Sequence, residues 1–264
     1  SDGSPDYLHK FTQFLRCQRE IKWDAINLSK ILQDSRVYSF LRTGPRQLCI
    51  INTAGLNDYI PLDGYEVFLQ KISKNFRDSL RKARNKLNSY TSVMFITSRE
   101  KPELQHLLAQ FLELEASGWK GAKGTNSAIK QNRRLQQFYE RLALEGPCEI
   151  SLLTVSGIAI AGTFSIHLGD SLYILKIAYD ENYSRIAPGN MLLEWLIKHH
   201  TNYADVTNIN LVSDAIWHHR WMPSQLGVYN CHIFNGTLNG LIIFSCLKTK
   251  SLIRPLYHAA RKVL

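Results

Sequence analysis

The segment from Ser171 to Ile197 constrains the fold of this chain more than any other. It begins with an apolar run typical of a buried strand, passes through the polar turn Pro188-Gly189-Asn190, and ends in apolar residues at helical spacing. Pro188 suits a first helical turn, because its missing N–H would have no intrahelical partner there. A helix that opens directly after a strand presents free N–H groups and a positive dipole end to a phosphate. The segment predicts an α/β fold, with either an anion site or an ordinary connection at the turn.

The order of the other expected elements indicates a mixed sheet flanked by helices. Short turns at 156–157 and 169–170 join three strands into an antiparallel meander, and a β–α–β crossover follows. The expected strands are 92–97, 149–155, 158–167, 172–179, 208–212 and 228–234, and the helices are 65–87, 102–117, 132–144, 238–264 and one from 188. Nearer the start we expect a helix over 7–33, a strand pair at 36–41 and 47–52, and a boundary loop at 55–64.

Charge is the feature of the composition that says most about partners. The formal net charge of the 264 residues is +10, which favours a phosphorylated cofactor, nucleic acid, a membrane surface or an acidic polymer. No apolar run is long enough to span a membrane and the polar start does not read as a secretory leader, so we expect a cytoplasmic protein. The five cysteines are widely spaced, which is typical of reduced thiols, and we expect no metal site.

Four pieces of sequence carry a resemblance to a known family: FRDSLRKARNKL (76–87), FLELEASGWKGAKGT (111–125), the stretch 156–192 and INLVSD (209–214). Together they resemble GNAT acyltransferases, and more specifically the bacterial branch associated with cellulose and exopolysaccharide biosynthesis, which is related to the Fem aminoacyl transferases. The resemblance implies a GNAT fold over residues 61–264. It also implies that residues 1–60 are the tail of a preceding GNAT-like half or an N-terminal extension of a longer protein.

The same resemblance implies a donor site. In GNAT enzymes a Gln/Arg-x-x-Gly-x-Gly/Ala turn holds the pyrophosphate of acyl-CoA, and this chain, aligned on Arg185, has Pro188 and Asn190 where the glycines belong. Fewer amides are then free to turn towards a phosphate, although the helix N-terminus remains. The resemblance assigns the phosphates to Arg185, Gly189 and Asn190. The alternative is that Arg185 is a surface charge and Gly189 only relaxes the turn.

By the same resemblance, the backbone of Lys176, Ile177 and Ala178 binds a pantetheine arm, unless these residues only pack the sheet. The glycine-flanked pair Trp119 and Lys120 suits a mobile loop that closes over a substrate, with the indole as a stacking face for a sugar. The alternative is a helix C-cap with Trp119 in the core.

Three residues are candidates for proton transfer. Glu115 adjoins the glycine-rich loop, and Asp214 follows a strand that runs towards the expected cleft. His218 lies in the patch Trp217–Trp221, where Arg220 could also meet an anionic group. The alternatives are a turn cap for Asp214 and an interaction surface for the patch.

Three functions remain open. The first is an N- or O-acyltransferase that moves an acetyl or other acyl group from acyl-CoA to an amine or hydroxyl, on a polysaccharide or its precursor. The second is a Fem-like transferase that uses aminoacyl-tRNA, whose binding would weaken steeply with salt. The third is an inactive scaffold in a synthase complex, for which we expect a filled or collapsed cleft between the fourth and fifth strands. The basic helix 71–86 is either a solvated face or a contact surface for a polyanion such as tRNA or a lipid surface. The closing helix 238–264 suits the same peripheral association with the inner face of the membrane.

Overall fold

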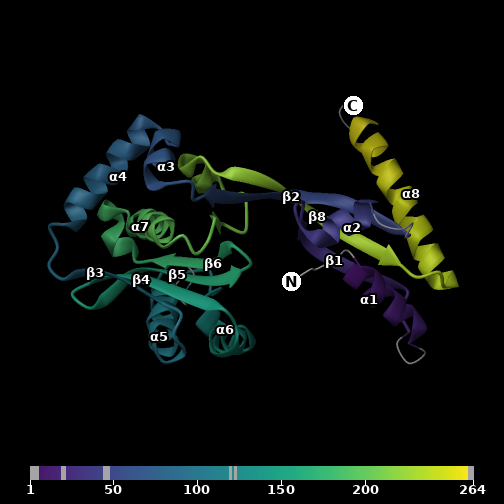
Figure 1. Ribbon diagram of the computed structural model, residues 1–264, viewed down its shortest axis with the longest axis horizontal. Helices are drawn as coiled ribbons and strands as arrows, with labels where there is room; N and C mark the ends of the chain where they lie inside the picture. The colour runs from purple at the N-terminus through teal and green to yellow at the C-terminus, as the bar shows by residue number, and fades with distance from the viewer. Residues whose placement is uncertain (1–5, 19–21, 44–47, 119–120, 122–123, 261–264) are drawn as a thin grey trace. The chain divides into compact units, whose positions relative to one another are not determined.

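The computed structural model describes residues 6–18, 22–43, 48–118, 121 and 124–260. The chain divides into two compact units (Figure 1). Unit 1 comprises the residues up to Asn57 together with those from Gln225 onwards, and unit 2 comprises Asp58–Ser224. The first boundary lies close to the one expected near residue 60, whereas the second boundary was not expected from the sequence.

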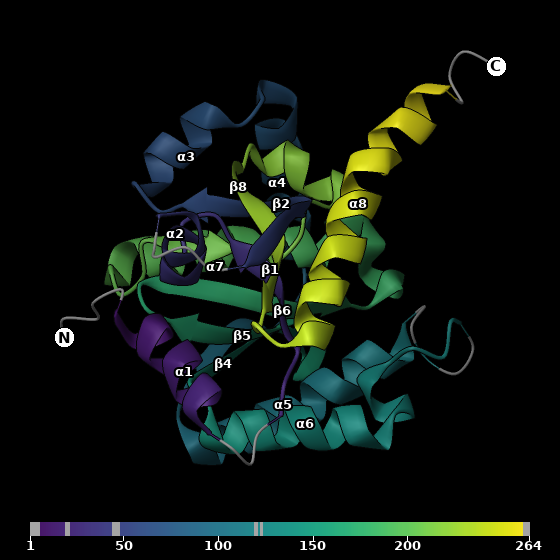
Figure 2. The ribbon, with the colours of Figure 1, turned by 90° about the vertical axis from the view of Figure 1, so that its right-hand side faces the viewer.

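Unit 1 is a small antiparallel sheet with helices. Its β1 (Ala25–Leu32) pairs with β8 (Ser224–Phe234), so that Ala25 lies opposite Phe234 (Figure 2). The first part of β2 (Cys49–Pro61) adds the next strand. The helices are α1 (Asp6–Cys17), α2 (Arg36–Thr43) and α8 (Leu238–Ala260).

Two expectations for unit 1 were wrong. The helix expected over 7–33 ends at Cys17, and residues 25–32 form a strand because they pair with β8, some 200 residues later in the chain. The strand expected at 36–41 is helix α2, whose first turn is capped by Ser35: the amide of Tyr38 donates to its hydroxyl at 3.2 Å. Long-range pairing and capping thus override the local pattern in both places.

Unit 2 has the mixed α/β architecture that the sequence predicts. Its strands are ordered β2-β7-β6-β5-β4-β3, where β6 and β7 are parallel and the other pairs described are antiparallel. Helices α5 and α6 cover one face of the sheet, and α7, α3 and α4 lie on the other side (Figure 1). The strands are β3 (Val93–Ser98), β4 (Cys148–Val155), β5 (Ile158–Leu168), β6 (Ser171–Tyr179) and β7 (Asn208–Asn210). The helices are α3 (Tyr65–Lys71), α4 (Lys74–Leu87), α5 (Lys101–Ser117), α6 (Arg133–Glu145) and α7 (Pro188–Tyr203), with short turns η1 (Ile129–Gln131), η2 (Glu181–Ile186) and η3 (Ile216–Trp221).

The single helix expected over 65–87 is two helices. The chain is extended at Ile72, and Ser73 then caps α4 by accepting a hydrogen bond from the Phe76 amide at 3.2 Å. The loop expected at 55–64 is also replaced in part, because β2 continues to Pro61. No helix within the described ranges is long and apolar enough to cross a membrane.

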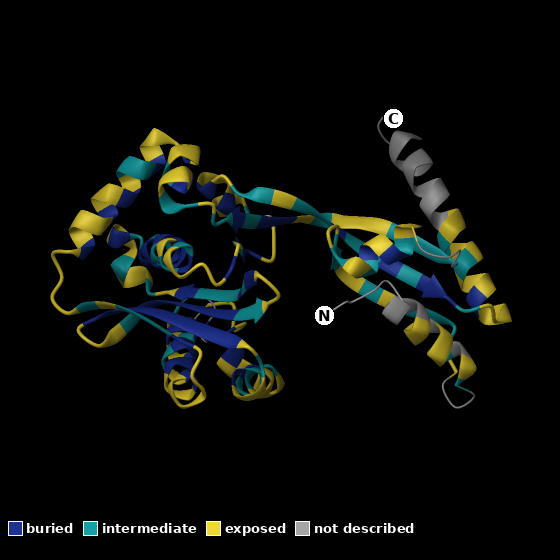
Figure 3. Cartoon of the chain, in the orientation of Figure 1, coloured by how far each residue is buried: buried dark blue, intermediate teal, exposed yellow. Residues whose placement is uncertain are grey.

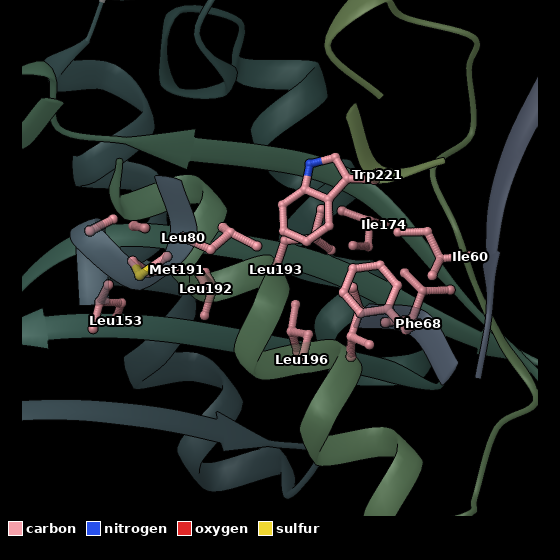
Figure 4. Packing of buried hydrophobic residues seen from close by; sticks show 14 of the residues in the cluster. Ile60, Phe68, Leu80, Leu153, Ile174, Met191, Leu192, Leu193, Leu196 and Trp221 are labelled. Carbon is pink, nitrogen blue, oxygen red and sulfur yellow. The ribbon is translucent and has the colours of Figure 1, made fainter. Parts of the chain in front are cut away.

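The sheet separates two hydrophobic clusters, and its middle strands are the most buried part of unit 2 (Figure 3). On the α7 side, Trp221 is 1% exposed and packs against Phe68 and Phe76, with ring centroids 5.9 and 5.1 Å away (Figure 4). On the α5 side, Phe164 meets the Tyr139 ring edge-on at 4.9 Å. The α7-side cluster fixes α7 against the sheet.

A buried ionic network holds the C-terminal end of α7. Glu149 on β4 accepts hydrogen bonds from His200 (3.0 Å), His167 (2.9 Å) and Arg99 (2.8 Å). The other ring nitrogen of His200 faces Asp205 at 3.1 Å, and Arg99 also pairs with Asp205. With both ring nitrogens on carboxylates, His200 is suited to carry a positive charge.

The network gives the stability of unit 2 a defined pH dependence. Burial opposes charge on His200, but its hydrogen bonds to Glu149 and Asp205 outweigh burial and raise its pKa above 6.5. Likewise, burial alone would raise the pKa values of Glu149 and Asp205, but their cationic partners lower them below 4.5 and 3.8. The His200 contribution is complete below pH 6.5 and is lost as the pH rises through its raised pKa, whereas the carboxylate contribution is lost in acid.

We therefore expect the free energy of unfolding to be highest between pH 4.5 and 6.5 and to fall on the alkaline side. Urea unfolding at a series of pH values would measure this. His200→Gln should remove the alkaline decrease while the neighbouring His199, whose pKa burial lowers, stays in place. An alkaline decrease that survives in this variant would show that another group causes it.

Candidate active site

The sheet of unit 2 opens where its two parallel strands part. β6 pairs with β7 only from Ser171, opposite Asn208, to Tyr173, opposite Asn210. Beyond this point β6 continues to Tyr179 along β5, whereas β7 has ended. The β7 side of β6 thus has no neighbouring strand after Tyr173 in the described part of the chain.

A β-bulge at Leu175 accompanies the opening. Phe164 on β5 lies opposite Lys176 and Ser165 lies opposite Ile174, so Leu175 is an extra residue on β6. A bulge bends its strand and increases the local twist. The last residues of β6 are thereby turned out of the line that pairing with β7 would require.

A cleft of about 690 Å³ lies at this opening. One wall is β6, the floor includes the first residues of α7, and the other wall is the segment that follows β7. The lining residues are Ile174, Leu175, Lys176, Ile177, Tyr179, Ser184, Ala187, Pro188, Gly189, Asn190, Leu211, Ser213, Trp217 and His218. The cleft therefore combines apolar surface with an ammonium, hydroxyls, an amide and an imidazole.

His218 is the best-positioned proton acceptor in the cleft. The residue is 1% exposed, and its Nδ1 lies 2.8 Å from Oδ2 of the fully buried Asp58 on β2. A carboxylate only accepts hydrogen bonds, so Nδ1 is the donor in this pair and Nε2 is the ring nitrogen left for another partner. Asp58 is itself fixed through its backbone, which exchanges hydrogen bonds with Ser213 and Leu211. A histidine oriented by a buried carboxylate is a well-built general base.

The start of α7 offers a restricted anion site. Ala187 caps the helix in the left-handed conformation (φ 46°), and its carbonyl accepts from the amides of Asn190 (2.9 Å) and Met191 (3.1 Å). Pro188 has no N–H, so Gly189 provides the backbone amide that remains for a ligand among the described residues of this turn. An anion here would be held by that amide, with Lys176 of β6 lining the same cleft.

Five of the site residues proposed from the sequence line this cleft: Lys176, Ile177, Gly189, Asn190 and His218. Gly189 lies against Tyr179, because a Cβ added to it would be 3.6 Å from the Tyr179 ring. The sequence did not point to Asp58, Ser184 or Ser213. Asp58 stands 160 residues before His218, so no local pattern connects the two.

The other proposed site residues lie elsewhere. Arg185 is exposed on η2, Asp214 is exposed in the loop after β7, and Ala178 is buried in the α5-side core. Buried Glu115 accepts a hydrogen bond from the Ile129 amide at 2.7 Å, which ties α5 to η1. The guanidinium of Arg220 lies 4.8 Å from the Phe76 ring centre. None of these five lines the cleft, and Trp119 and Lys120 lie outside the described residues.

The cleft contains no metal centre that the described residues could build. No group of three or more His, Cys, Asp or Glu side chains in the described ranges is placed to hold a metal ion. The His167, Glu149 and His200 cluster is instead an ionic network within the core.

A mixed sheet that parts at a parallel pair, with a helix opening at the gap, defines the GNAT class of acyltransferase. Residues 74–212 match the family described as "Acetyltransferase (GNAT) domain", and the chain belongs to this family. No curated protein sequence matches the chain.

Solved structures share this fold at low sequence identity. FemX superposes with a TM-score of 0.58 at 11% identity, over 86% of this chain and 77% of FemX. The C-terminal domain (DUF2156) of a putative lysylphosphatidylglycerol synthetase from Agrobacterium fabrum gives 0.56 at 13% identity, over 92% of this chain and 77% of that domain. L-PGS from Bacillus licheniformis gives 0.53 at 13% identity, over 93% and 78%. These likenesses establish the fold.

Proposed function

We propose that unit 2 transfers an acyl group from acyl-CoA to a hydroxyl or amine acceptor in the cleft, with His218 as general base. The observation that carries this proposal is the His218–Asp58 pair at 2.8 Å in the wall of the cleft. The membership of the chain in the GNAT family supports a thioester donor. The open edge of β6 after Tyr173 suits the amide groups of an extended pantetheine arm, and Lys176 and the Gly189 amide suit its phosphates.

The groups present account for each bond and proton in the acyl transfer. The acceptor oxygen or nitrogen attacks the thioester carbonyl carbon, a C–O or C–N bond forms, and the C–S bond breaks. Nε2 of His218 takes the proton from the acceptor and returns it to the departing thiolate. Asp58 stabilises the imidazolium that exists between these two transfers.

A second donor, aminoacyl-tRNA, is favoured by the charge of α4. This helix of 14 residues carries six basic side chains and a single acidic one, and a polyanion would be attracted to it. The likeness to FemX is compatible with this alternative. An acceptor hydroxyl on a saccharide stays part of the proposal under either donor. The inactive-scaffold alternative loses support, because the cleft between β6 and β7 is open.

Calorimetric titration with acetyl-CoA tests the donor. A methyl group at Gly189 would make ordinary contact with Tyr179 at 3.6 Å, whereas an indole would fill the turn. We expect Gly189→Ala to bind acetyl-CoA within a few-fold of the unaltered chain and Gly189→Trp to lose saturable binding. Desulfo-CoA, which keeps the nucleotide and pantetheine, should bind like acetyl-CoA.

The absence of binding at millimolar acetyl-CoA would overturn the acyl-CoA donor. Filter binding with charged tRNA would then test the second donor, which predicts an affinity that decreases steeply with salt. Reversal of several charges on α4 should weaken tRNA binding and leave acetyl-CoA binding unchanged.

A further inference from the structure

The segment that forms the acceptor wall exposes an unusual amount of apolar surface. Between residues 212 and 222, four large apolar side chains are exposed: Val212 (39%), Ile216 (86%), Trp217 (43%) and Met222 (57%). Single exposed apolar residues are ordinary, but several in one segment beside a cleft are typical of a binding surface. We call these four residues the apolar rim.

The exposure of the rim does not result from a loosely attached segment. Trp221, from the same segment, is buried between Phe68 and Phe76, and His218 is held by Asp58. The amide of Val212 donates to the Asn210 side chain at 2.9 Å. The segment is therefore fixed from its buried side while it presents the rim outward.

The backbone of the segment is also strained at both ends. Val212 and Met222 have φ values of 62° and 47°, in the left-handed region that residues other than glycine rarely adopt. Such conformations persist where the surrounding structure enforces them, and they are concentrated at functional sites. At Val212 the strain redirects the chain between two residues of the cleft wall, Leu211 and Ser213.

Trp217 is the rim residue that lines the cleft, and it contacts His218. The indole of Trp217 meets the His218 ring edge-on, with centroids 4.2 Å apart, and both residues line the cleft. A substrate that places its reacting group at Nε2 of His218 therefore has apolar surface next to that group. The polar surroundings carry both signs of charge, because Arg220 and Asp214 are exposed in the same segment and Lys176 lines the cleft.

We infer that the acceptor is an amphiphile whose hydroxyl reacts at His218 while an aliphatic chain lies on Ile216, Trp217 and Met222. This inference rests on the proposed acyl transfer and names the class of acceptor. The acceptor oxygen forms an ester with the acyl carbon, and CoA leaves as the thiol. The aliphatic chain of the acceptor takes no part in bond formation.

The test uses n-alkyl β-D-glucosides of increasing chain length, below their critical micelle concentrations, with acetyl-CoA as donor. We expect KM for the glucoside to decrease by up to about four-fold for each added methylene that the rim covers. Ile216→Ser should flatten this dependence. The matched control is Ile158→Ser, because Ile158 is 62% exposed at the start of β5, outside the segment 212–222.

The outcomes test the apolar acceptor site separately from the acyl-CoA donor. The inference is overturned by a KM that does not depend on chain length, by equal effects of the two serine variants, or by an Ile216→Ser variant that only changes the oligomeric state. Calorimetric binding of the glucosides without donor separates this inference from the proposed function. Chain-length-dependent glucoside binding without acetyl-CoA binding would reject the donor and keep the apolar acceptor site.

A separate experiment distinguishes two sources of the aliphatic chain, a lipid within a bilayer and a dispersed amphiphile. Sedimentation with phosphatidylcholine vesicles, with and without phosphatidylglycerol, compares the unaltered chain with Ile216→Ser. Binding that the variant loses supports a lipid within a bilayer, and chain-length dependence without vesicle binding supports a dispersed amphiphile.

Discussion

Replacement of His218 by glutamine is expected to decrease kcat for acyl transfer by about 10²- to 10⁴-fold, the usual contribution of a positioned general base. Glutamine preserves the approximate size of the side chain but cannot take the acceptor proton. Donor binding should change little, because Lys176 and Gly189, to which we assign the donor phosphates, are unaltered. The measurement is the release of free thiol from acetyl-CoA with a saturating acceptor, alongside calorimetric donor binding.

Asp58 should act through His218, as a positioning residue. Asp58→Asn is expected to lower kcat with donor binding intact, and the double variant should be no slower than His218→Gln alone, because two residues of one unit are not additive. A purely structural role of Asp58 would instead give additive losses.

Asp214 supplies the matched control for the dyad. It is exposed in the loop after β7, four residues before His218, and it does not line the cleft. We expect Asp214→Asn to retain kcat within a few-fold. An Asp214→Asn variant as slow as His218→Gln, or a His218→Gln variant near full activity, would reject His218 as the base.

The largest effect on stability is expected at Glu149, whose replacement by alanine should decrease the free energy of unfolding by about 3–5 kcal/mol. The side chain is 1% exposed and accepts hydrogen bonds from His200, His167 and Arg99. Without it, the fully buried His200 loses the anion that faces its Nε2, and a cavity remains beneath α7. Urea unfolding followed by tryptophan fluorescence would measure the loss, since Trp195 and Trp221 both lie in unit 2.

Glu113 provides the control for Glu149. Its side chain is 73% exposed and forms an ion pair with Lys130 on the surface of unit 2. Exposed pairs contribute about 0–1 kcal/mol, so Glu113→Ala should hardly change the unfolding curve. Similar losses in the two variants would mean that the Glu149 network contributes no more than a surface pair.

The parts of the fold that the sequence predicted are those specified by neighbouring residues. The meander from β4 to β6 depends on two short turns at 156–157 and 169–170, and α7 depends on the turn at Pro188. By contrast, residues 25–32 are a strand because of β8, and their own pattern did not separate strand from helix.

The same difference between neighbouring and distant residues explains which parts of the site the sequence could predict. His218 was a candidate because of its unusual neighbours, but its carboxylate partner Asp58 enters from β2. Glu115 was proposed for its place beside a glycine-rich loop, and the structure gives its carboxylate to the Ile129 amide. Arg185 was proposed by analogy with a motif, and only the three-dimensional path of η2 shows that it is exposed outside the cleft.

The position of Asp58 has a consequence for dissecting the protein. Unit 2 begins at this residue, in the middle of β2, so the carboxylate of the dyad is also the first residue of its compact unit. An excised unit 2 would place a frayed chain terminus at the group that orients His218. An isolated unit 2 would therefore test catalysis fairly only if residues before Asp58 were retained. A circular permutation that moves the new ends into the turn at 156–157 would serve the same purpose.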